Sequence, residues 1–265
     1  MLFRSIFYAI CDAAVRGVDQ FEGKPIDRNQ MLVNLGLTLN GLVTADSSIK
    51  TLDDFSRKTI LLPPNGAMNP FAEAIYDRVD PSILFEGMDQ TQRVEATLSK
   101  KSAGMLFAAF AMTPELDKWT PNPACQEFAS RADYVGFIST PQDIANEFIA
   151  EPGGRFEDNW QVVGTIPALA SDERQTDPWS VFINNCAYFA DQDMEDEVVL
   201  EALSILVEHR SELVDYHPQA AMLSKPDVMA VYAGPIWFHP AAEEYFKSIG
   251  VTPMWMSEYL ASITG

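Results

Sequence analysis

Cysteine is scarce in this chain of 265 residues, which has three: Cys11, Cys125 and Cys186. They are odd in number and far apart, which excludes the paired cysteines of a small disulfide-stapled domain and the close spacing of a zinc site. One disulfide among the three stays open, because the sequence does not choose the pair.

Histidine is equally scarce, and His209, His217 and His239 share no metal-ligand spacing such as H-E-x-x-H. The sequence also has no G-x-S-x-G motif and no Cys/His pairing that would mark a nucleophile and its base. We therefore predict structural histidines, no metal, no cofactor and no catalytic residue. An enzyme remains the alternative, because absence of a motif is weak evidence and fold does not dictate function.

Basic residues are few: 18 Lys and Arg stand against 38 Asp and Glu, for a net charge of −20. Nucleic-acid binding needs clustered basic side chains, and so does docking on anionic lipid, so both are disfavoured. No apolar run approaches the ~20 residues of a membrane helix. Residues 6–10 are too short for a signal-peptide core. We predict no nucleic-acid partner and no stable membrane insertion, and we interpret the excess acid as solvated surface.

The most informative stretch is 52–74, which predicts a short helical turn, a strand, a sharp turn and a helix. The helical turn is Leu52–Phe55, and Thr59–Leu62 is a compact aliphatic run typical of a buried strand. Pro63-Pro64-Asn65-Gly66 breaks that strand. Asn69 then serves as an N-cap with Pro70 at the first helical position.

The turn between this strand and this helix is a candidate anion site. A helix N-terminus offers free backbone N–H groups and the positive end of the helix dipole. Both suit a carboxylate or a phosphate. The alternative is an ordinary connection with water at the helix end. The candidate ligand-binding residues here are Asn65, Gly66, Ala67, Met68 and Asn69.

Strand and helix patterns alternate in the rest of the chain. Residues 31–45 carry leucines that alternate with Gly, Thr and Asn, the pattern of a half-buried strand, and 103–111 is a small, apolar run typical of a strand covered on both faces. A helix is predicted at 91–99. The acidic run 191–197 lacks the Gly and Glu of an EF-hand loop and is better explained as a helix N-terminus. The alternation indicates an α/β fold with a parallel or mixed sheet.

Four segments, in order, resemble the TAXI-type solute receptors of TRAP transporters, which are extracytoplasmic substrate-binding proteins. The segments are A-V-R-G with F-E-G-K-P at 14–25, D-F-S-R-K with P-P-N-G-A-M at 54–68, A-G-M-L-F-A-A-F-A at 103–111 and P-I-W-F-H-P-A-A-E-E-Y-F at 235–246. Gly66 and Met68 stand where the family has Ser and Thr hydroxyls, and Met105 stands where it has Asp. These departures point to a less polar ligand than is usual in the family, or to one held mainly by the first lobe of the family's proteins.

The resemblance implies the type II periplasmic-binding-protein fold: two α/β lobes with a cleft between them. Lobe one would comprise 1–50 and, together with C-terminal helices, 177–265, while lobe two would comprise 51–176. The first segment lies well inside the family's proteins, so we expect an incomplete first lobe, truncated at its N-terminus, with the signal peptide lost. In the family pattern, His239 caps or braces the loop before the last helix.

The resemblance also implies a function without chemistry. The lobes would close by a hinge on a small organic ligand, a carboxylate or an amino acid, and the closed form would dock on TRAP transporter membrane subunits. The location would be periplasmic. An enzyme, or a receptor feeding a sensor kinase, on the same fold is the alternative.

Further candidate residues follow from the same resemblance. Residues 31–45 would be the crossing strand on the cleft floor, where Thr38 and Asn40 face either the ligand or solvent. Ala108 and Ala109 would let a ligand approach a strand end. Trp179 would cover an apolar ligand or, as we favour, fill the core. Arg16 is a candidate carboxylate partner or a surface charge.

Overall fold

The computed structural model describes residues 4–7, 14–17, 21–64, 69–111, 119–149, 163–166, 179–216, 220, 223, 225–232, 236–255, 258 and 262. The chain forms two compact units. Unit 1 comprises Met1–Leu37, Phe110–Lys118 and Asn184–Gly265, and unit 2 comprises Thr38–Ala109 and Trp119–Ile183. The strands β2 (Asn29–Thr44), β5 (Gly104–Ala111) and β9 (Trp179–Asp191) contribute residues to both units. The expected lobe bounds, 1–50, 51–176 and 177–265, therefore remain a prediction.

Unit 2 is built on parallel strands. β3 (Thr59–Leu62) pairs in parallel with β4 (Leu84–Gly87) on one side and with β5 on the other. The order continues through β2 to β9. The first of the three parallel strands thus lies between the second and the third, which is the arrangement of a doubly wound α/β sheet.

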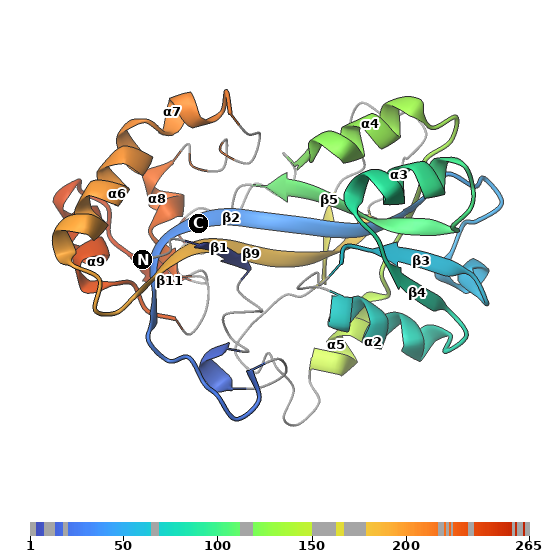
Figure 1. Cartoon of the computed structure of the whole chain (residues 1–265), viewed down its shortest axis with the longest axis horizontal. Coiled ribbons are helices and arrows are strands. Elements are labelled where there is room, and N and C mark those ends of the chain that lie inside the picture. The colour runs from blue at the N-terminus through green and yellow to red at the C-terminus, as the bar shows by residue number, and fades with distance from the viewer. Residues whose placement is uncertain are drawn as a thin grey trace. The chain divides into compact units, whose positions relative to one another are not determined.

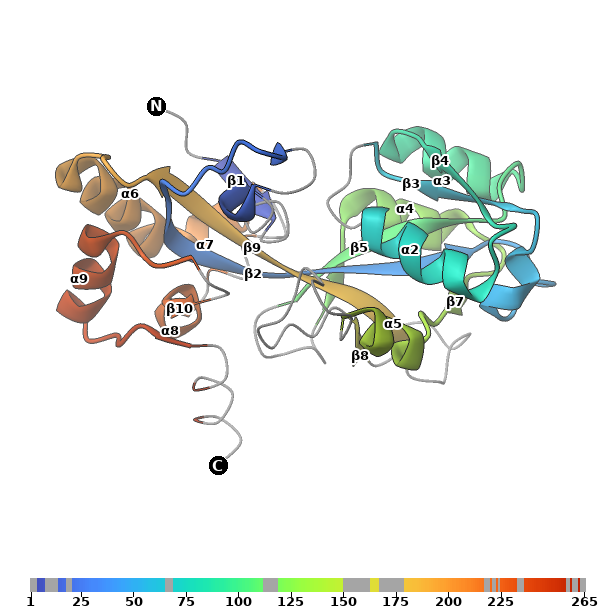
Figure 2. The same cartoon turned by 90° about the horizontal axis from the view of Figure 1, so that it is seen from below.

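Helices cover both faces of this sheet. Helices α2 (Asn69–Val79) and α5 (Gln142–Ile149) lie on one face, and α3 (Gln90–Leu98) and α4 (Pro123–Arg131) lie on the other (Figures 1 and 2). The shorter elements are η2 (Leu52–Phe55), β6 (Thr120–Pro121), β7 (Gly136–Ile138) and β8 (Val163–Ile166). The prediction of a mixed α/β fold is confirmed.

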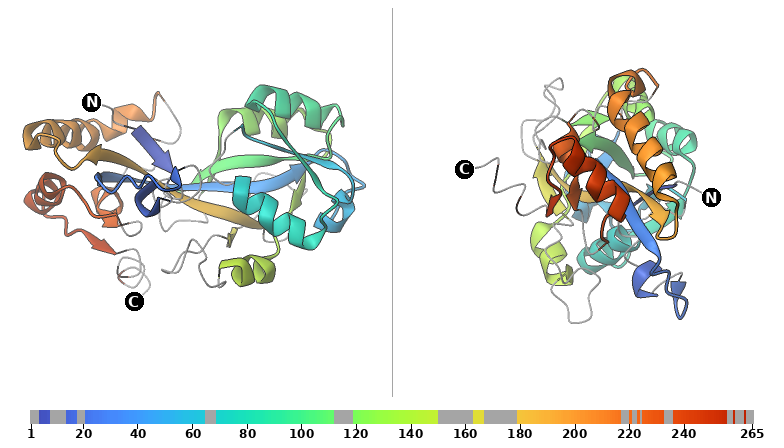
Figure 3. Two further views of the ribbon diagram at one scale, coloured as in Figure 1. Left: turned by 60° about the horizontal axis from the view of Figure 1, so that its bottom comes forward. Right: turned by 90° about the vertical axis from the view of Figure 1, so that its left-hand side faces the viewer.

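Unit 1 contains the remaining residues of β2 and β9. Strand β1 (Arg4–Phe7), whose first residues match no segment of the resembling family, pairs antiparallel with β9. Helices α6 (Asp196–Glu208) and α9 (Pro240–Ser248) lie side by side (Figure 3). The remaining elements are α7 (Arg210–Leu213), α8 (Pro226–Met229), and the parallel pair β10 (Val231–Tyr232) and β11 (Met254–Trp255).

Local signals placed several elements correctly. The helical turn Leu52–Phe55 and the strand Thr59–Leu62 have their predicted bounds, and the helix predicted with Asn69 as its N-cap begins one residue earlier, with Asn69 as its first residue. Asp196 and Glu197 occupy the first turn of α6, as the helix interpretation of the acidic run requires. No helix in the described part of the chain is both long and apolar enough to cross a bilayer.

The strand predicted at 31–45 is present, but the prediction that only one of its faces is buried is wrong. β2 is buried at Leu35, Leu37 and Leu39, but also at Gly36 and Thr38 between them. The reason is cover on both faces: in unit 2, α2 and α5 lie on one face of the sheet that contains β2, and α3 and α4 lie on the other (Figure 1). A strand enclosed in this way loses the alternation between a wet and a dry face.

Candidate ligand-binding site

The carboxyl ends of β3 and β5 form the topological switch point of unit 2. From β3 the chain passes through α2 to β4 on one side, and β5 is added on the other side. The helices α2 and α3 therefore leave the sheet on opposite faces (Figure 1). In open α/β sheets, ligands bind outside the carboxyl ends of the strands at such a point.

Thr38 lies at this end of the sheet. The hydroxyl of Thr44 donates to the carbonyl of Ala103 at 2.6 Å, and a Cβ built on Gly104 would lie 2.5 Å from the carbonyl oxygen of Val43. The end of β2 is therefore beside the start of β5, and because the strands remain paired, they run antiparallel. Counting equal numbers of residues back along β2 from Thr44 and forward along β5 from Ala103 places Thr38 level with Ala109.

The Thr38 hydroxyl has no hydrogen-bond partner among the described residues. The side chain is 4% exposed and its Oγ1 atom is fully buried. Thr44, on the same strand, is satisfied: its Oγ1 donates to the Ala103 carbonyl and accepts from the Asp46 N–H at 3.0 Å. Buried polar groups are normally paired, so an orphan hydroxyl is a group to explain.

Asn69 brings a second such atom to the same end. Its Nδ2 donates to the carbonyl of Pro63 at 2.7 Å, which ties the first residue of α2 back to the end of β3. Its Oδ1 is buried and has no partner in the described part of the chain. The predicted site residues Asn65, Gly66, Ala67 and Met68 lie outside the described residues.

Ala108 and Ala109 end the unit 2 portion of β5, and the first turn of α4 holds the backbone there. The Ala108 N–H donates to Sγ of Cys125 at 3.2 Å, and the Ala108 carbonyl accepts from the Asn122 N–H at 3.0 Å. Ala109 is buried and lies level with Thr38 on the paired strand β2. The helix α4 was missed in the sequence, although Asn122-Pro123 gives the same start signal as Asn69-Pro70.

Cys125 is an acceptor here and not a nucleophile. Burial raises the pKa of its thiol to about 12, although the Ala108 N–H and the nearby Arg93 act in the opposite direction. The thiol is therefore protonated at neutral pH, and only a thiolate is reactive.

Arg93, on α3, is a site residue that the sequence analysis missed. It is 7% exposed, and its Nη1 donates to the carbonyl of Leu106 at 2.8 Å. Desolvation by burial lowers the pKa of its guanidinium, and its Nε atom has no partner among the described residues. A signal was present: Arg93 shares the buried face of α3 with Val94 and Thr97, at the spacing of an inward-facing helix stripe.

Other candidate residues lie elsewhere. Trp179 is 1% exposed, its indole N–H donates to the Ile138 carbonyl at 3.2 Å, and its ring packs on Phe137, so the favoured core interpretation is the one that the structure supports. Asn40 is partly buried on β2 in unit 2. Arg16 is exposed and belongs to unit 1.

His239 has the structural role predicted for it. It is the N-cap of α9, and its Nδ1 accepts from the Ala241 N–H at 3.3 Å. Within the described ranges, no three His, Cys, Asp or Glu side chains gather closely enough to hold a metal ion.

No protein-family model and no curated protein sequence matches this chain. Among solved structures, a substrate-binding protein of an amino acid ABC transporter aligns over 71% of this chain and 63% of its own, with 12% identity and a TM-score of 0.38. A structure named as the periplasmic sulfonate-binding protein SsuA from Methylobacillus flagellatus KT aligns over 84% and 63%, with 12% identity and a TM-score of 0.37. A probable amino-acid ABC transporter extracellular-binding protein from Bacillus subtilis aligns over 74% and 62%, with 9% identity and a TM-score of 0.31. The chain spans less than two thirds of the length of each of these three proteins.

Proposed function

We propose that this chain is a solute-binding receptor that captures a small organic molecule for a membrane transporter. One observation carries the proposal: Thr38 and Asn69, each named as a ligand residue from the sequence, both have buried polar atoms at the carboxyl end of the unit 2 sheet that find no partner among the residues the structure describes. Leaving such a group unpaired costs about 1–3 kcal/mol. A ligand that hydrogen-bonds them offsets that cost.

Reversible binding suits these groups better than catalysis does. A hydroxyl and a side-chain amide oxygen supply hydrogen bonds, whereas general acid–base chemistry needs a titratable group near its working pH. The cysteine at this end of the sheet is protonated, because burial raises its pKa to about 12. A receptor needs neither a nucleophile nor a base.

The finer parts of the proposal come from the sequence resemblance. It favours a TRAP-type transporter as the partner, a carboxylate or an amino acid as the ligand, and a periplasmic location. The genes beside this one distinguish the partners: TRAP membrane subunits support the proposal, and an ABC permease or a sensor kinase replaces that part of it.

The test is a thermal melt of the full chain against a panel of small carboxylates, amino acids and sugars. A ligand at about 100 times its dissociation constant stabilises by roughly 2.7 kcal/mol, which is a rise of several degrees for a protein of this size. We expect one chemical class to raise the melting temperature. No rise with any solute, in a protein that melts cooperatively, contradicts the proposal.

The variant Thr38→Val then locates the site. Valine has the shape of threonine without the hydroxyl, so Thr38→Val removes a buried unsatisfied group. We expect the ligand-free protein to keep its stability or gain up to about 1 kcal/mol, while binding weakens roughly tenfold.

Thr44→Val is the matched control on the same strand. Its hydroxyl has two partners, so its loss destabilises the ligand-free protein by roughly 1–3 kcal/mol and leaves ligand affinity unchanged. Equal destabilisation by both variants, with no change in affinity for Thr38→Val, would show that Thr38 is an ordinary core residue.

A further inference from the structure

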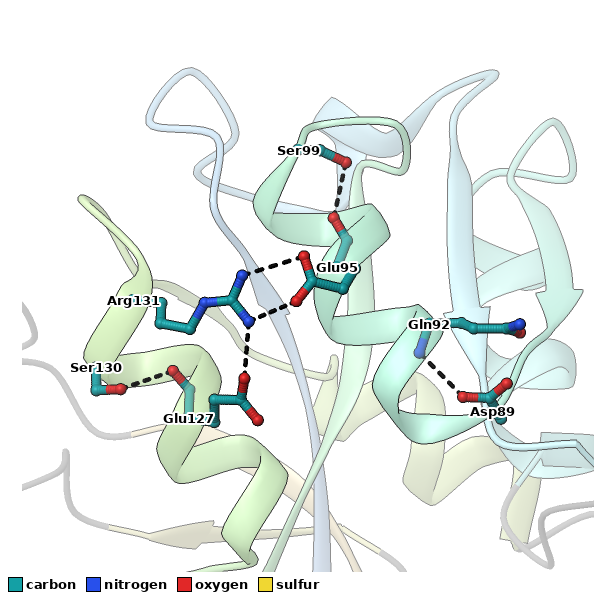
Figure 4. Close-up of polar contacts among 7 residues, drawn as sticks. All are labelled: Asp89, Gln92, Glu95, Ser99, Glu127, Ser130 and Arg131. Carbon is teal, nitrogen blue, oxygen red and sulfur yellow. Dashed lines mark hydrogen bonds and ion pairs between the residues drawn. The ribbon is translucent and has the colours of Figure 1, made fainter.

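Arg93 is a buried cation without a carboxylate partner in the described part of the chain. Its side chain is 7% exposed, and the one hydrogen bond that it makes there is to the neutral carbonyl of Leu106. Asp89 attracts the guanidinium but forms no ion pair with it. The Asp89 Oδ1 instead accepts from the Gln92 N–H at 3.0 Å and caps α3 (Figure 4).

Arg131 on the neighbouring helix α4 shows the usual arrangement. Its guanidinium donates to Glu95 and to Glu127 on the exposed surface of this helix layer, where water screens the charge in addition (Figure 4). The two arginines thus reverse the expected order, because in the described part of the chain the exposed one forms ion pairs with two carboxylates and the buried one forms none. A buried charge without an ion-pair partner is unfavourable.

The contact with the Leu106 carbonyl shows where Arg93 lies on the sheet. The register pairs β3 with β5 at Ile60 with Gly104 and at Leu61 with Met105. Continuing this register by one residue brings Leu106, whose carbonyl accepts from Arg93, level with Leu62, the last residue of β3. The guanidinium therefore lies beside the carboxyl end of β3, in the same unit as Thr38 and Asn69.

All three buried unpartnered polar side-chain atoms found in the described part of unit 2 are therefore at this end. They are the Thr38 Oγ1, the Asn69 Oδ1 and the Arg93 Nε, and they come from β2, α2 and α3. Two of them are neutral hydrogen-bonding groups, and the third carries a full positive charge.

We propose that Arg93 is the specificity-determining residue of this site and supplies the counter-charge for an acidic group of the ligand. The ligand is then a small anion whose oxygens match the planar guanidinium, of which a carboxylate is the commonest kind. This inference rests on the proposed function, and it explains how a chain with a net charge of −20 holds an anion: through one local cation against the overall field.

The test compares acids with their amides. Sodium acetate, succinate and glutamate and, as a sulfonate, sodium methanesulfonate are added to the full chain, with sodium chloride to match ionic strength. Acetamide, succinamide and glutamine serve as neutral counterparts of the carboxylates. We expect one acid to raise the melting temperature and its amide not to. We then expect Arg93→Gln to weaken that acid roughly 10- to 100-fold, the effect of losing a hydrogen bond to a charged partner.

Two further variants control for structural effects. Arg131→Gln removes an arginine from the same helix layer without touching the site, and we expect the acid to bind it as it binds the wild type. Arg93→Lys keeps a cation that can reach the Leu106 carbonyl but loses the planar fork, so we expect an intermediate affinity. It also replaces Arg93→Gln if that variant does not fold.

The outcomes separate this inference from the proposed function. Equal binding of the acid by wild type and Arg93→Gln, or equal binding of acid and amide by the wild type, overturns the role of Arg93 while leaving a receptor. If none of these solutes and no sugar shifts the melt, the receptor proposal fails and the inference fails with it.

Discussion

At the scale of single residues, Gly41 sets the packing around the buried Trp179. A Cβ built on Gly41 would lie 1.8 Å from Cζ2 of the indole, far inside van der Waals contact. The indole is fixed by its hydrogen bond to Ile138 and by the rings of Phe107 and Phe137. We therefore predict that Gly41→Ala lowers the free energy of unfolding by about 1–3 kcal/mol, the usual cost of overpacking. Urea titration followed by tryptophan fluorescence measures it.

Gly87→Ala is the matched control for that variant. A Cβ on Gly87 would come no closer than 3.7 Å to the Cα of Pro64, which is ordinary contact. We expect Gly87→Ala to keep the urea midpoint of the wild type. If the two variants unfold at the same urea concentration, Trp179 is not packed against Gly41 as described.

The resemblance and a local signal together predicted part of the site. Thr38 was named because the resemblance makes 31–45 the strand on the cleft floor, and Asn69 was named because it stands at a helix start. Arg93 was not named, because a cation on a helix usually faces water, and only its burial with Val94 and Thr97 reveals its role. Trp179 was ambiguous for the opposite reason: an indole suits a ligand or a core equally well until its N–H partner, the Ile138 carbonyl, is seen.

At the scale of elements, Arg131 joins α4 to α3 through Glu95 (Figure 4). Hydrogen bonds from Arg131 are the largest cause that holds the pKa of the Glu95 carboxyl below its ordinary value. A carboxylate with a lowered pKa in the folded state contributes stability above its unfolded pKa, and this is lost as pH falls through the folded pKa. Wild type should therefore exceed Arg131→Gln in stability at neutral pH, and the two should converge in acid.

An NMR titration of the Glu95 carboxyl carbon checks this directly. We expect its midpoint below about 4.3, the usual value for glutamate, in the wild type and a return toward that value in Arg131→Gln. A midpoint unchanged by the substitution would show that the two helices are not joined by this pair in solution.

The helices and strands that could be predicted are those whose own residues carry a sequence signal. The run Thr59–Leu62 is short, aliphatic and closed by two prolines, and it is β3 at those bounds. β9 runs from Trp179 to Asp191, and its length is set by pairing with β8 and β1. Those partners come from distant parts of the chain, so no local pattern shows them.

At the scale of the whole molecule, the α/β class followed from alternating helix and strand patterns, but the strand order did not. The order places β3 between β4 and β5 and joins β2, from the first 44 residues, to β9, from beyond residue 178. These pairings create the switch point where Thr38, Asn69 and Arg93 share one end of a sheet. Sequence spacing alone gives no sign that residues 38, 69 and 93 belong to the same end of one sheet.

The central claim is that the chain binds a small acidic solute and leaves it chemically unchanged. Equilibrium dialysis of the full chain against the mixed panel of carboxylates, amino acids, sugars and amides tests it, with NMR spectroscopy of the solutes held in the protein compartment. We predict that one acid is retained at about one molecule per chain and is recovered intact after denaturation. Retention of no solute, or recovery of the retained solute as a different molecule, would contradict this account.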